Sequence, residues 1–331
     1  MEQEKKNQNG AQELSVGDQI KVRREKLANL QAEGHNPFEI TKFVQTTNSR
    51  EIRENFDAME GKPVSIAGRM MSKRGMGKVS FCDLQDKEGR IQLYARKDEM
   101  DEDDYNRFKK YDIGDIIGIE GEVFRTQRGE MSVRAKHITL LSKSLLPLPE
   151  KFHSIQDTEL CWRRRYLDLC MNGETRRRFL FKSQLVREIR RYLEDNGYIE
   201  IETPVLIDHP SGATARPFVA HHNALDMDVY LRIAPETYLK RAIVGGFTKV
   251  FEFARCFRNE GMDTTRLQDF TMLEGYCAYY NYRDNMRFLQ GMLQTVITKI
   301  RGSAVISING TEIDFGAEWA VVTFRELILK D

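Results

Sequence analysis

Residues 61–144 constrain the fold more than any other part of the sequence, because apolar and polar side chains alternate there over short segments. Such alternation is typical of strands that are buried on one face only. Turns that contain glycine or charged residues separate the segments. The five segments are PVSIAGRMM, KVSFCDLQ, RIQLYA, DIIGIEGEVF and EMSVRAKHITLL. This part of the chain is therefore predicted to form a small domain built from β-strands.

One amphipathic segment interrupts the strands. The sequence EMDEDDYNRFKKY lies between the third and fourth strands and spaces Met100, Tyr105 and Phe108 as on one face of a helix. Five strands with one helix after the third is the order of an OB-fold. This small Greek-key barrel often binds oligonucleotides across one face. We therefore expect an OB-fold barrel over residues 61–146.

The charge of the chain gives no global sign of a polyanionic partner. Lysine and arginine number 51 and aspartate and glutamate 50, so the formal net charge is +1. Any contact with RNA must then come from a local patch. The loop SKRGMGK supplies Lys73, Arg74 and Lys78 beside Phe81, which would combine phosphate attraction with a ring for base stacking. A core phenylalanine beside a solvated basic turn explains these residues equally well.

Length and composition set the broad class. The 331 residues, 40% of them hydrophobic, suffice for two domains with separate cores. No apolar run approaches the roughly 20 residues that cross a bilayer, and the first residues lack the apolar core of a signal peptide, so we expect a cytoplasmic protein. The five cysteines form no CxxC pair, which argues against a disulfide framework and a zinc knuckle.

A second domain is predicted after the proline-bearing connector at residues 145–152. Helices are expected over CWRRRYLDL, over ETRRRFLFKSQLVREIRRYLEDNG, which carries Phe181, Leu185, Ile189 and Leu193 on one face, over PETYLKRAIVGG, and over RDNMRFLQGMLQTVITKIRG. Strands are expected over YIEIETP, DVYLRIA, TKVFEFARCF and FTMLEGYCAYY, with a hairpin in AVISINGTEIDF. Long strands joined as hairpins indicate an antiparallel α+β sheet. No GxGxxG or GxxxxGK loop occurs, which excludes Rossmann and P-loop phosphate binding.

The most specific pattern lies between the two long strands. Phe257-Arg258-Asn259-Glu260 is followed by a short loop and then by Arg266 and Phe270. An arginine can hold a phosphate or a carboxylate through two parallel N–H bonds, and a glutamate can accept from an amino group of a base. The phenylalanine ring can stack on a purine. The pattern indicates a site for a nucleotide.

This pattern resembles motif 2 of the class II aminoacyl-tRNA synthetases. The helix that stops at Gly197, the strand YIEIET and Pro204 resemble motif 1, which builds the homodimer interface in that class. The stretch SGATARPFVAHHNALDMDVYLRIAPETYLKRAIVGGFTKVFE is similar to the lysyl branch, as are RYLDL and the NPF sequence at residues 36–38. The resemblance covers residues from about 20 to 290.

The resemblance implies the roles of individual residues. For lysine, it places Gly212, Glu236 and Glu274 around the α-amino group and Tyr276 toward the ε-ammonium. Arg258 would bridge the lysine carboxylate and the α-phosphate of ATP.

For ATP, Glu260 and Phe270 would hold adenine and Arg266 would reach the γ-phosphate. In the barrel, the anticodon-binding positions would be Phe81, Gln92 and Glu130, with Arg69 nearby.

The implied activity is lysine–tRNA ligation. Lysine would attack the α-phosphorus of ATP, and the lysyl group would then pass to tRNA(Lys), with Mg²⁺ as cofactor and a homodimer formed through the motif 1 region. The implied domains are a helical extension at 1–60, the OB-fold anticodon-binding domain at 61–146 and a class II catalytic domain at 147–331.

Two departures from the family pattern qualify this interpretation. Arg266-Leu267-Gln268-Asp269 stands where many members have His-Asn-Pro-Glu, and no GxGxGxxR motif 3 follows residue 300. The motif 3 arginine, the magnesium ligands and the acidic partner of the lysine ε-ammonium are therefore expected beyond Asp331. On this interpretation the catalytic domain is incomplete and the 331-residue chain is inactive alone.

Two alternatives remain at this stage. An aspartyl- or asparaginyl-tRNA synthetase shares the barrel and motif 2, although carboxylates at Glu236 and Glu274 would repel an aspartate side chain. A non-catalytic, synthetase-like RNA-binding or regulatory protein would suit the lack of motif 3. His221 and His222 have no cysteine or carboxylate cluster at metal-ligand spacing, so they are expected to be structural.

Overall fold

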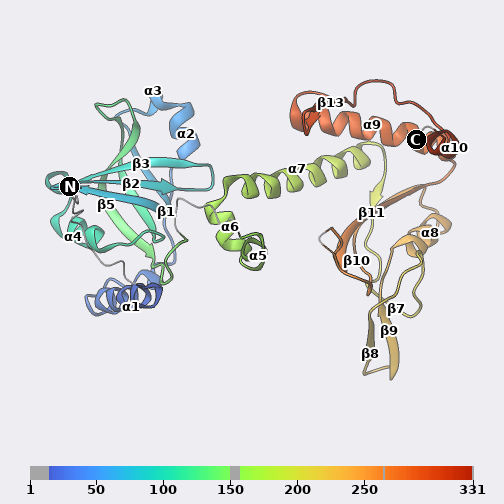
Figure 1. Cartoon of the computed structure of the whole chain (residues 1–331), viewed down its shortest axis with the longest axis horizontal. Helices are drawn as coiled ribbons and strands as arrows, with labels where there is room; N and C mark the ends of the chain where they lie inside the picture. The colour runs from blue at the N-terminus through green and yellow to red at the C-terminus, as the bar shows by residue number, and fades with distance from the viewer. Residues whose placement is uncertain (1–14, 150–156, 264, 330–331) are drawn as a thin grey trace, which may run out of the picture. The chain divides into compact units, whose positions relative to one another are not determined.

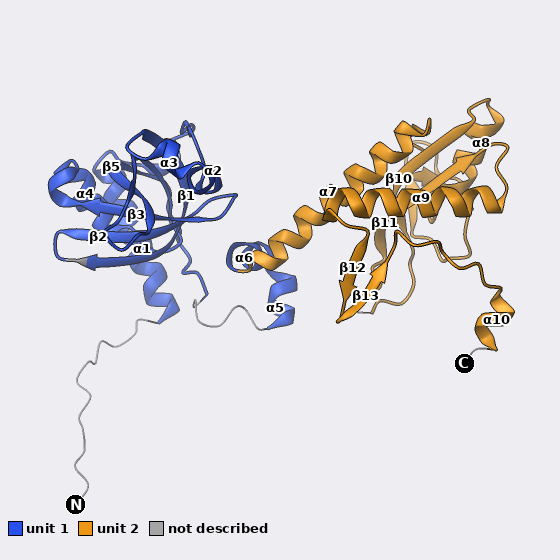
Figure 2. Cartoon of the chain, turned by 90° about the horizontal axis from the view of Figure 1, so that it is seen from above, with its two compact units in different colours: residues 1–171 blue, residues 172–331 orange. Residues whose placement is uncertain are grey.

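The computed structural model describes residues 15–149, 157–263 and 265–329. It divides the chain into two compact units, residues 1–171 and 172–331, which Figure 2 shows in different colours. The second part of the predicted connector, from residue 150, lies outside the described residues. The domain ranges proposed from the sequence stay predictions.

The first unit contains the expected barrel. Five strands close it in the order β1-β2-β3-β5-β4 (Figure 1). The pair β3–β5 is parallel and the other neighbours are antiparallel. The strands are β1 (Pro63–Met76), β2 (Val79–Gln85), β3 (Arg90–Arg96), β4 (Ile116–Arg125) and β5 (Met131–Ser142). The five-strand prediction is confirmed, and so is the helix after the third strand, α4 (Glu102–Lys110), which a short 3-10 turn η2 (Lys97–Glu99) precedes.

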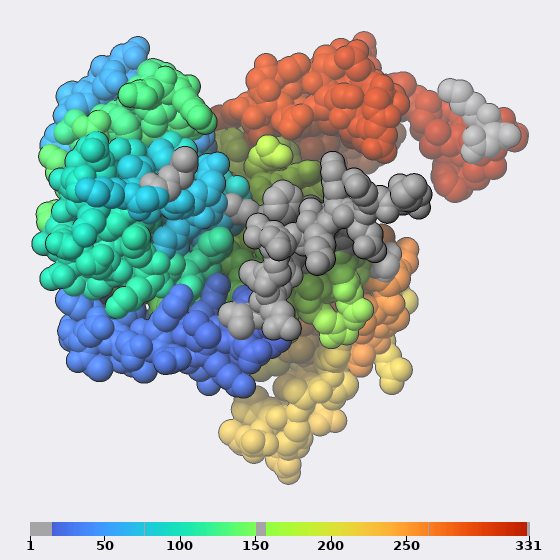
Figure 3. All heavy atoms as spheres, turned by 60° about the vertical axis from the view of Figure 1, so that its left-hand side comes forward, coloured from blue at the N-terminus to red at the C-terminus, as the bar shows by residue number. Residues whose placement is uncertain are grey.

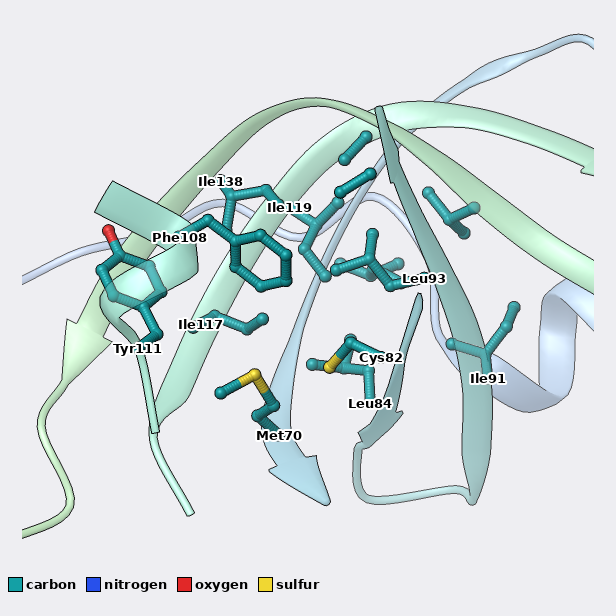
Figure 4. Packing of buried hydrophobic residues seen from close by; sticks show 14 of the residues in the cluster. Met70, Cys82, Leu84, Ile91, Leu93, Phe108, Tyr111, Ile117, Ile119 and Ile138 are labelled. Carbon is teal, nitrogen blue, oxygen red and sulfur yellow. The ribbon is translucent and has the colours of Figure 1, made fainter. Parts of the chain in front are cut away.

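Alternation along the strands builds the barrel core. Every second residue of β2 and β3 is buried, so one face of each strand points inward. Figure 4 shows these inward side chains meeting residues of β1, β4 and β5 and the ring of Phe108 from α4. Tyr105 and Phe108 are fully buried and Met100 packs against the cluster, as their spacing predicted.

A basic helix covers one side of this barrel. Helix α1 (Val16–Ala32) begins after Ser15, whose hydroxyl accepts from the backbone N–H of Asp18. Figure 3 shows α1, in dark blue, lying against the surface of the barrel. Lys26 donates to Asp112 at 2.6 Å, and Arg23 donates to the carbonyl of Ser144 at 3.0 Å. The charges of α1 therefore hold the helix on the barrel. Between α1 and β1 lie η1 (Pro37–Glu39), α2 (Ser49–Glu54) and α3 (Phe56–Met59).

The second unit packs two long helices on a small sheet. Helices α7 (Gly173–Asp195) and α9 (Tyr282–Arg301) supply Leu193, Met292 and Val296 to a core that also holds Phe251. The sheet has the order β11-β10-β6, and a second sheet has the order β7-β9-β8. The remaining elements are β6 (Ile199–Glu200), β7 (Leu206–Ile207), β8 (Val219–His222), β9 (Met227–Leu231), α8 (Glu236–Val244), β10 (Lys249–Phe257), β11 (Asp269–Cys277), β12 (Val305–Ile308), β13 (Thr311–Asp314) and α10 (Phe324–Ile328).

Several expected elements take a different form. The segment CWRRRYLDL forms two short helices, α5 (Thr158–Arg163) and α6 (Arg165–Met171), because Arg164 leaves the helical conformation. The strand expected over YIEIETP is confined to β6, and β6 runs parallel to β10, so the sheet is mixed. Phe181 is 41% exposed, whereas Leu185, Ile189 and Leu193 pack into the core, so only the second half of the α7 face is buried. The hairpin β12–β13 turns at Asn309 and Gly310, both with positive φ, as predicted.

Candidate functional site

The hairpin of β10 and β11 forms the floor of the candidate nucleotide site. The two strands pair antiparallel from Lys249 opposite Cys277 to Phe257 opposite Asp269. One further bond, from the backbone N–H of Arg258 to the carbonyl of Gln268 at 2.8 Å, extends the pairing into the loop. This register brings the guanidinium of Arg258 to 5.2 Å from the centre of the Phe270 ring. Two residues that are twelve positions apart thus share one face of the hairpin.

A cavity of about 320 Å³ opens over this hairpin. Its volume lies in the range of roughly 300–1,000 Å³ that small-molecule sites occupy. Its lining residues come from the turn between the strands and their ends: Arg258, Glu260, Gly261, Thr265, Arg266, Leu267, Gln268 and Phe270. All four residues that the sequence assigned to ATP therefore line one cavity.

Arg258 is the chemically distinctive group of this cavity. Its Nε is buried and has no hydrogen-bond partner among the described residues. A buried donor without a partner costs about 1–3 kcal/mol, so such groups point to a ligand. A guanidinium without an acceptor in a cavity is suited to an anion such as a phosphate or a carboxylate.

Arg266 lies at the exposed edge of the same cavity. Its Nη1 donates to Asp263 at 2.6 Å, and the Asp263 carboxylate also accepts from the backbone N–H groups of Thr265 and Arg266. The hydrogen bond from the Thr265 hydroxyl contributes most to holding the pKa of Asp263 below its usual range. The side chain of Arg266 is 78% exposed, so it is held by the loop and remains accessible to a ligand.

Glu260 faces the loop before β8. Its carboxylate accepts from the backbone N–H of Arg216 at 3.3 Å, and its carbonyl accepts from the side chain of Gln268 at 3.2 Å. Because Glu260 is exposed, its second oxygen can reach an amino group in the cavity. Gln268 belongs to the segment in which this chain departs from the family pattern, and its hydrogen bond to Glu260 helps to hold the turn.

A cluster of carboxylates lies beside the nucleotide cavity. Glu236 is the first residue of α8, after Pro235. Gly212 has φ +87°, and a Cβ at this position would lie 3.0 Å from the Cβ of Glu236 and 3.2 Å from that of Ala234. A side chain at 212 would be strained and would crowd Glu236, so the glycine keeps this part of the site open.

Glu274 and Tyr276 complete this cluster from β11. The phenolic hydroxyl of Tyr276 donates to Glu274 at 3.1 Å. Burial raises the pKa of Glu274, the Glu236 charge raises it further, and the Arg258 charge lowers it. Burial also raises the pKa of Tyr276. The three charged residues are thus close enough to influence one another, and the site joins an anion-binding group to two cation-binding groups.

A buried network that the sequence analysis missed supports these strands. Arg232, the residue that follows β9, donates to Glu252 at 2.7 Å, to the hydroxyl of Thr203 at 2.8 Å and to the carbonyl of Arg255 at 2.8 Å. The side chains of Arg232 and Glu252 are only 5% and 6% exposed. Glu252 stands directly opposite Glu274 in the register of β10 and β11. The sequence offered only Arg232 within the apolar segment DVYLRIA and Glu252 within TKVFEFARCF, and did not show that these two charges meet.

The outer face of the barrel carries a row of aromatic rings. Phe81 and Tyr94 are direct partners across β2 and β3, and their ring centres lie 5.4 Å apart. Phe124 continues the row at 5.4 Å from Tyr94, and the guanidinium of Arg134 lies 4.5 Å from the Phe124 ring centre. Only Phe81 was identified from the sequence, because the other rings join it through strand pairing.

The remaining predicted barrel residues take different positions. Gln92 lies next to this row and accepts from the hydroxyl of Ser132 at 3.1 Å. Glu130 is exposed in the loop between β4 and β5. Arg69 donates to the carbonyl of Gly114 at 2.7 Å, which is a contact within the barrel.

The basic loop contributes less than its sequence suggests. The ammonium of Lys73 donates to the carbonyls of Phe108 and Tyr111 at 2.6 and 2.9 Å, so it caps the end of α4. Lys78 pairs with Asp98 at 3.5 Å, and Arg74 is exposed. The expectation that Lys73 offers phosphate attraction is wrong, because its charge is held inside the domain.

The histidines and cysteines form no metal site in the part of the chain that the structure describes. No three histidine, cysteine, aspartate or glutamate side chains gather there so as to hold an ion. His221 lies 3.3 Å from both Asp226 and Asp228 across the β8–β9 hairpin. None of the five cysteines forms a disulfide with another described residue. Over the same residues, no helix has both the length and the apolar character required to cross a membrane.

Comparison with known proteins agrees with this geometry. Residues 157–331 match the family model of class II tRNA synthetases (D, K and N), and residues 64–141 match the model of the OB-fold nucleic acid binding domain. The chain is 49% identical to a lysine–tRNA ligase of Syntrophomonas wolfei over 316 residues, which cover 96% of the chain and 64% of that relative.

Two further relatives with the same name show similar identity. A lysine–tRNA ligase of Lactococcus lactis is 50% identical over 95% of the chain and 65% of its own length. One of Enterococcus faecalis is 50% identical over 91% of the chain and 62% of its own length. The chain thus spans somewhat less than two thirds of the relatives that it matches.

Proposed function

The chain belongs to the class II tRNA synthetases of the aspartate, lysine and asparagine group, and we propose that it serves as a lysine–tRNA ligase. One observation carries the proposal: Arg258 has a buried Nε without a hydrogen-bond partner among the described residues, its guanidinium lies 5.2 Å from the centre of the Phe270 ring, and its charge lowers the pKa of Glu274. This arrangement offers one cation to two anionic reactants and two anions to a cationic amino acid.

The first step joins lysine to AMP. A carboxylate oxygen of lysine attacks the α-phosphorus of ATP, a new O–P bond forms, and the bond to the bridging oxygen breaks so that pyrophosphate leaves. Arg258 binds the lysine carboxylate and the α-phosphate together, which aligns them and neutralises the charge that develops between them. Phe270 and Glu260 hold the adenine by stacking and by an accepted hydrogen bond, and Arg266 binds the γ-phosphate.

The carboxylate cluster selects the amino acid. Glu236, beside the open position at Gly212, binds the α-ammonium together with Glu274, and Tyr276 lies toward the ε-ammonium of the lysine side chain. An aspartate substrate would place its own carboxylate against these groups, so the same geometry argues against aspartate.

The second step transfers the lysyl group. A ribose hydroxyl of the tRNA attacks the carbonyl carbon of lysyl-adenylate, and AMP leaves. We propose that the anticodon binds the aromatic row of the barrel, where Phe81 stacks on an unpaired base and Gln92 and Glu130 read base edges.

Two further parts of the proposal concern magnesium and assembly. Mg²⁺ is proposed as the partner of the ATP phosphates, whose charge it would stabilise. Among the described residues no three histidine, cysteine, aspartate or glutamate side chains gather to hold an ion, and no step here depends on it. A second copy of the chain is proposed to cover the exposed apolar residues near α7 and β6, where Leu180 and Ile199 are 60% and 49% exposed.

Exchange of labelled pyrophosphate into ATP tests the proposal on the whole protein. Each of the twenty amino acids is added separately, and the exchange is expected to depend on lysine and not on aspartate or asparagine. Exchange that depends on aspartate or asparagine would reassign the substrate within the family. The absence of exchange with every amino acid, in a protein that still binds tRNA, would favour a non-catalytic RNA-binding role.

A further inference from the structure

The carboxylate cluster already contains a cation of the protein itself. Lys240 lies on α8, one turn after Glu236, and its ammonium donates to the Glu236 carboxylate at 2.5 Å. The same ammonium lies 5.6 Å from the centre of the Tyr276 ring, within the range of a cation–π contact. Lys240 is therefore placed between the two groups that were assigned to the two ammonium groups of a lysine substrate.

Charge accounts for this placement. Glu236 and Glu274 bring two carboxylates into the cluster; burial raises the pKa of Glu274, and the nearby charge of Glu236 raises it further. Arg258 supplies one cation at the nucleotide side, and Lys240 supplies the second. The paired arrangement neutralises Glu236 while the site is empty, and a glutamate one turn before a lysine is the favourable order on a helix.

We propose that Lys240 is an intramolecular competitor of the substrate: its ammonium occupies the Glu236 position in the empty site and must leave when the α-ammonium of lysine binds. This inference rests on the function proposed above and goes beyond it, because it concerns a residue without a role in the reaction. The Lys240 side chain is 57% exposed, so it can turn into solvent on its flexible stem without any movement of α8.

The competition acts on binding and not on the chemical step. Lys240 is displaced both in the bound substrate complex and in the transition state. Removal of its charge therefore changes the free energies of these two states equally, relative to the free protein. The variant Lys240→Met keeps the apolar stem and removes the charge. It is expected to bind L-lysine about two- to tenfold more tightly, the range that a half-exposed ion pair with a ring contact supports. The KM for lysine should fall, and kcat should stay unchanged.

Arg241→Met is the matched control. Arg241 is the next residue of α8, carries the same charge and is exposed, but its guanidinium lies over Tyr238 at 4.9 Å and not over the cluster. This variant should bind lysine as the unmodified protein does. Lys240→Arg restores the cation and should return the lysine affinity to the unmodified value or below it.

A second ligand locates the competition. The compound 6-aminohexanoate has the carboxylate and the distal ammonium of lysine but lacks the α-ammonium. It does not need the Glu236 position but still reaches Tyr276, so Lys240→Met should lower its dissociation constant clearly less than that of lysine. Isothermal titration of both ligands into the unmodified protein and the three variants measures these constants, and ATP affinity confirms that each variant is folded.

The outcomes separate the inference from the proposed function. If the unmodified protein does not bind lysine, the proposed function fails. If it binds lysine but Lys240→Met binds lysine equally or more weakly, Lys240 is a neutral surface residue or a substrate-binding group, and the inference is wrong. Equal tightening of lysine and 6-aminohexanoate would also overturn it, because the effect would then be a change of overall charge.

Discussion

Replacement of Arg232 by methionine should destabilise the second unit, residues 172–331, more than any exposed substitution there. Arg232 is 5% exposed and donates to Glu252, to both oxygens of Thr203 and to the carbonyl of Arg255. Its loss leaves the Glu252 carboxylate buried, with the Thr203 hydroxyl as the remaining donor at 2.6 Å. Breaking a buried pair from one side costs about 3–5 kcal/mol.

This cost is large beside the whole stability of a domain, which is about 5–15 kcal/mol. For a unit of this size, roughly 2–4 °C of melting temperature corresponds to each kcal/mol, so the expected shift is about 6–20 °C. Differential scanning calorimetry of the protein measures it. The exposed Arg255→Met, on the neighbouring strand, is the control and should change stability by less than about 0.5 kcal/mol.

The double variant Arg232→Met with Glu252→Met tests the reason for the loss. Two apolar side chains of similar length leave no buried charge, so most of the stability should return. The reasoning is refuted if Arg232→Met alone melts within a degree or two of the unmodified protein. It is refuted equally if the double variant is as unstable as the two single losses added together.

Three other predictions concern the barrel and the lysine site. Phe81→Ala should weaken tRNA charging by about 1–3 kcal/mol and leave lysyl-adenylate formation unchanged, which filter-bound aminoacylation and pyrophosphate exchange measure together. Phe38→Ala removes an exposed ring of the first unit that lies outside the aromatic row and is the control. A parallel fall of both activities in Phe81→Ala would make Phe81 a folding residue. Burial raises the pKa of Glu274, and lysine binding needs this carboxylate ionised, so binding should be lost on acidification at a higher pH than for an ordinary glutamate. Titration calorimetry of lysine binding between pH 4 and 8 checks this. A decline of the affinity only below the ordinary glutamate range would contradict it. Lys73→Met should lower the free energy of unfolding in urea by about 1–3 kcal/mol, because the carbonyls at the end of α4 lose their hydrogen-bond donor. An unchanged free energy of unfolding would show that water replaces the ammonium at no cost.

Local sequence patterns were sufficient to predict the strands of the barrel and the residues that line the nucleotide cavity. Alternation predicted the five strands, because every second side chain enters one core. The spacing of Arg258 and Phe270 around a short loop predicted their approach, since an antiparallel hairpin brings the ends of its strands together. Gly212 and Glu236 were assigned by resemblance, and the structure brings them into contact distance.

Other features depend on pairing that no local pattern encodes. Tyr94 and Phe124 join Phe81 only through the pairing of β2 with β3, of β3 with β5, and of β5 with β4, the strand that carries Phe124. The pair of Arg232 and Glu252 links two strands, and each residue alone resembles an exposed charge in an apolar segment. Lys240 and Glu236 resemble an ordinary helix surface pair until Tyr276 is placed beside them. Lys73 appeared available to RNA because the sequence does not show that the end of α4 lies within its reach.

The central claim is that Arg258 serves both reacting partners, and a comparison of two arginines tests it most directly. Arg258 and Arg255 lie three residues apart on the same hairpin: Arg258 lines the cavity and has a buried Nε, whereas Arg255 has an exposed side chain paired to Asp269 at 3.7 Å. Lysine-dependent pyrophosphate exchange in the whole protein should fall by at least about 100-fold for Arg258→Ala, since a preorganised charge contributes about 3 kcal/mol to the transition state. Arg255→Ala should retain activity close to the unmodified protein. Exchange within a few-fold of the unmodified protein in both variants would contradict the account.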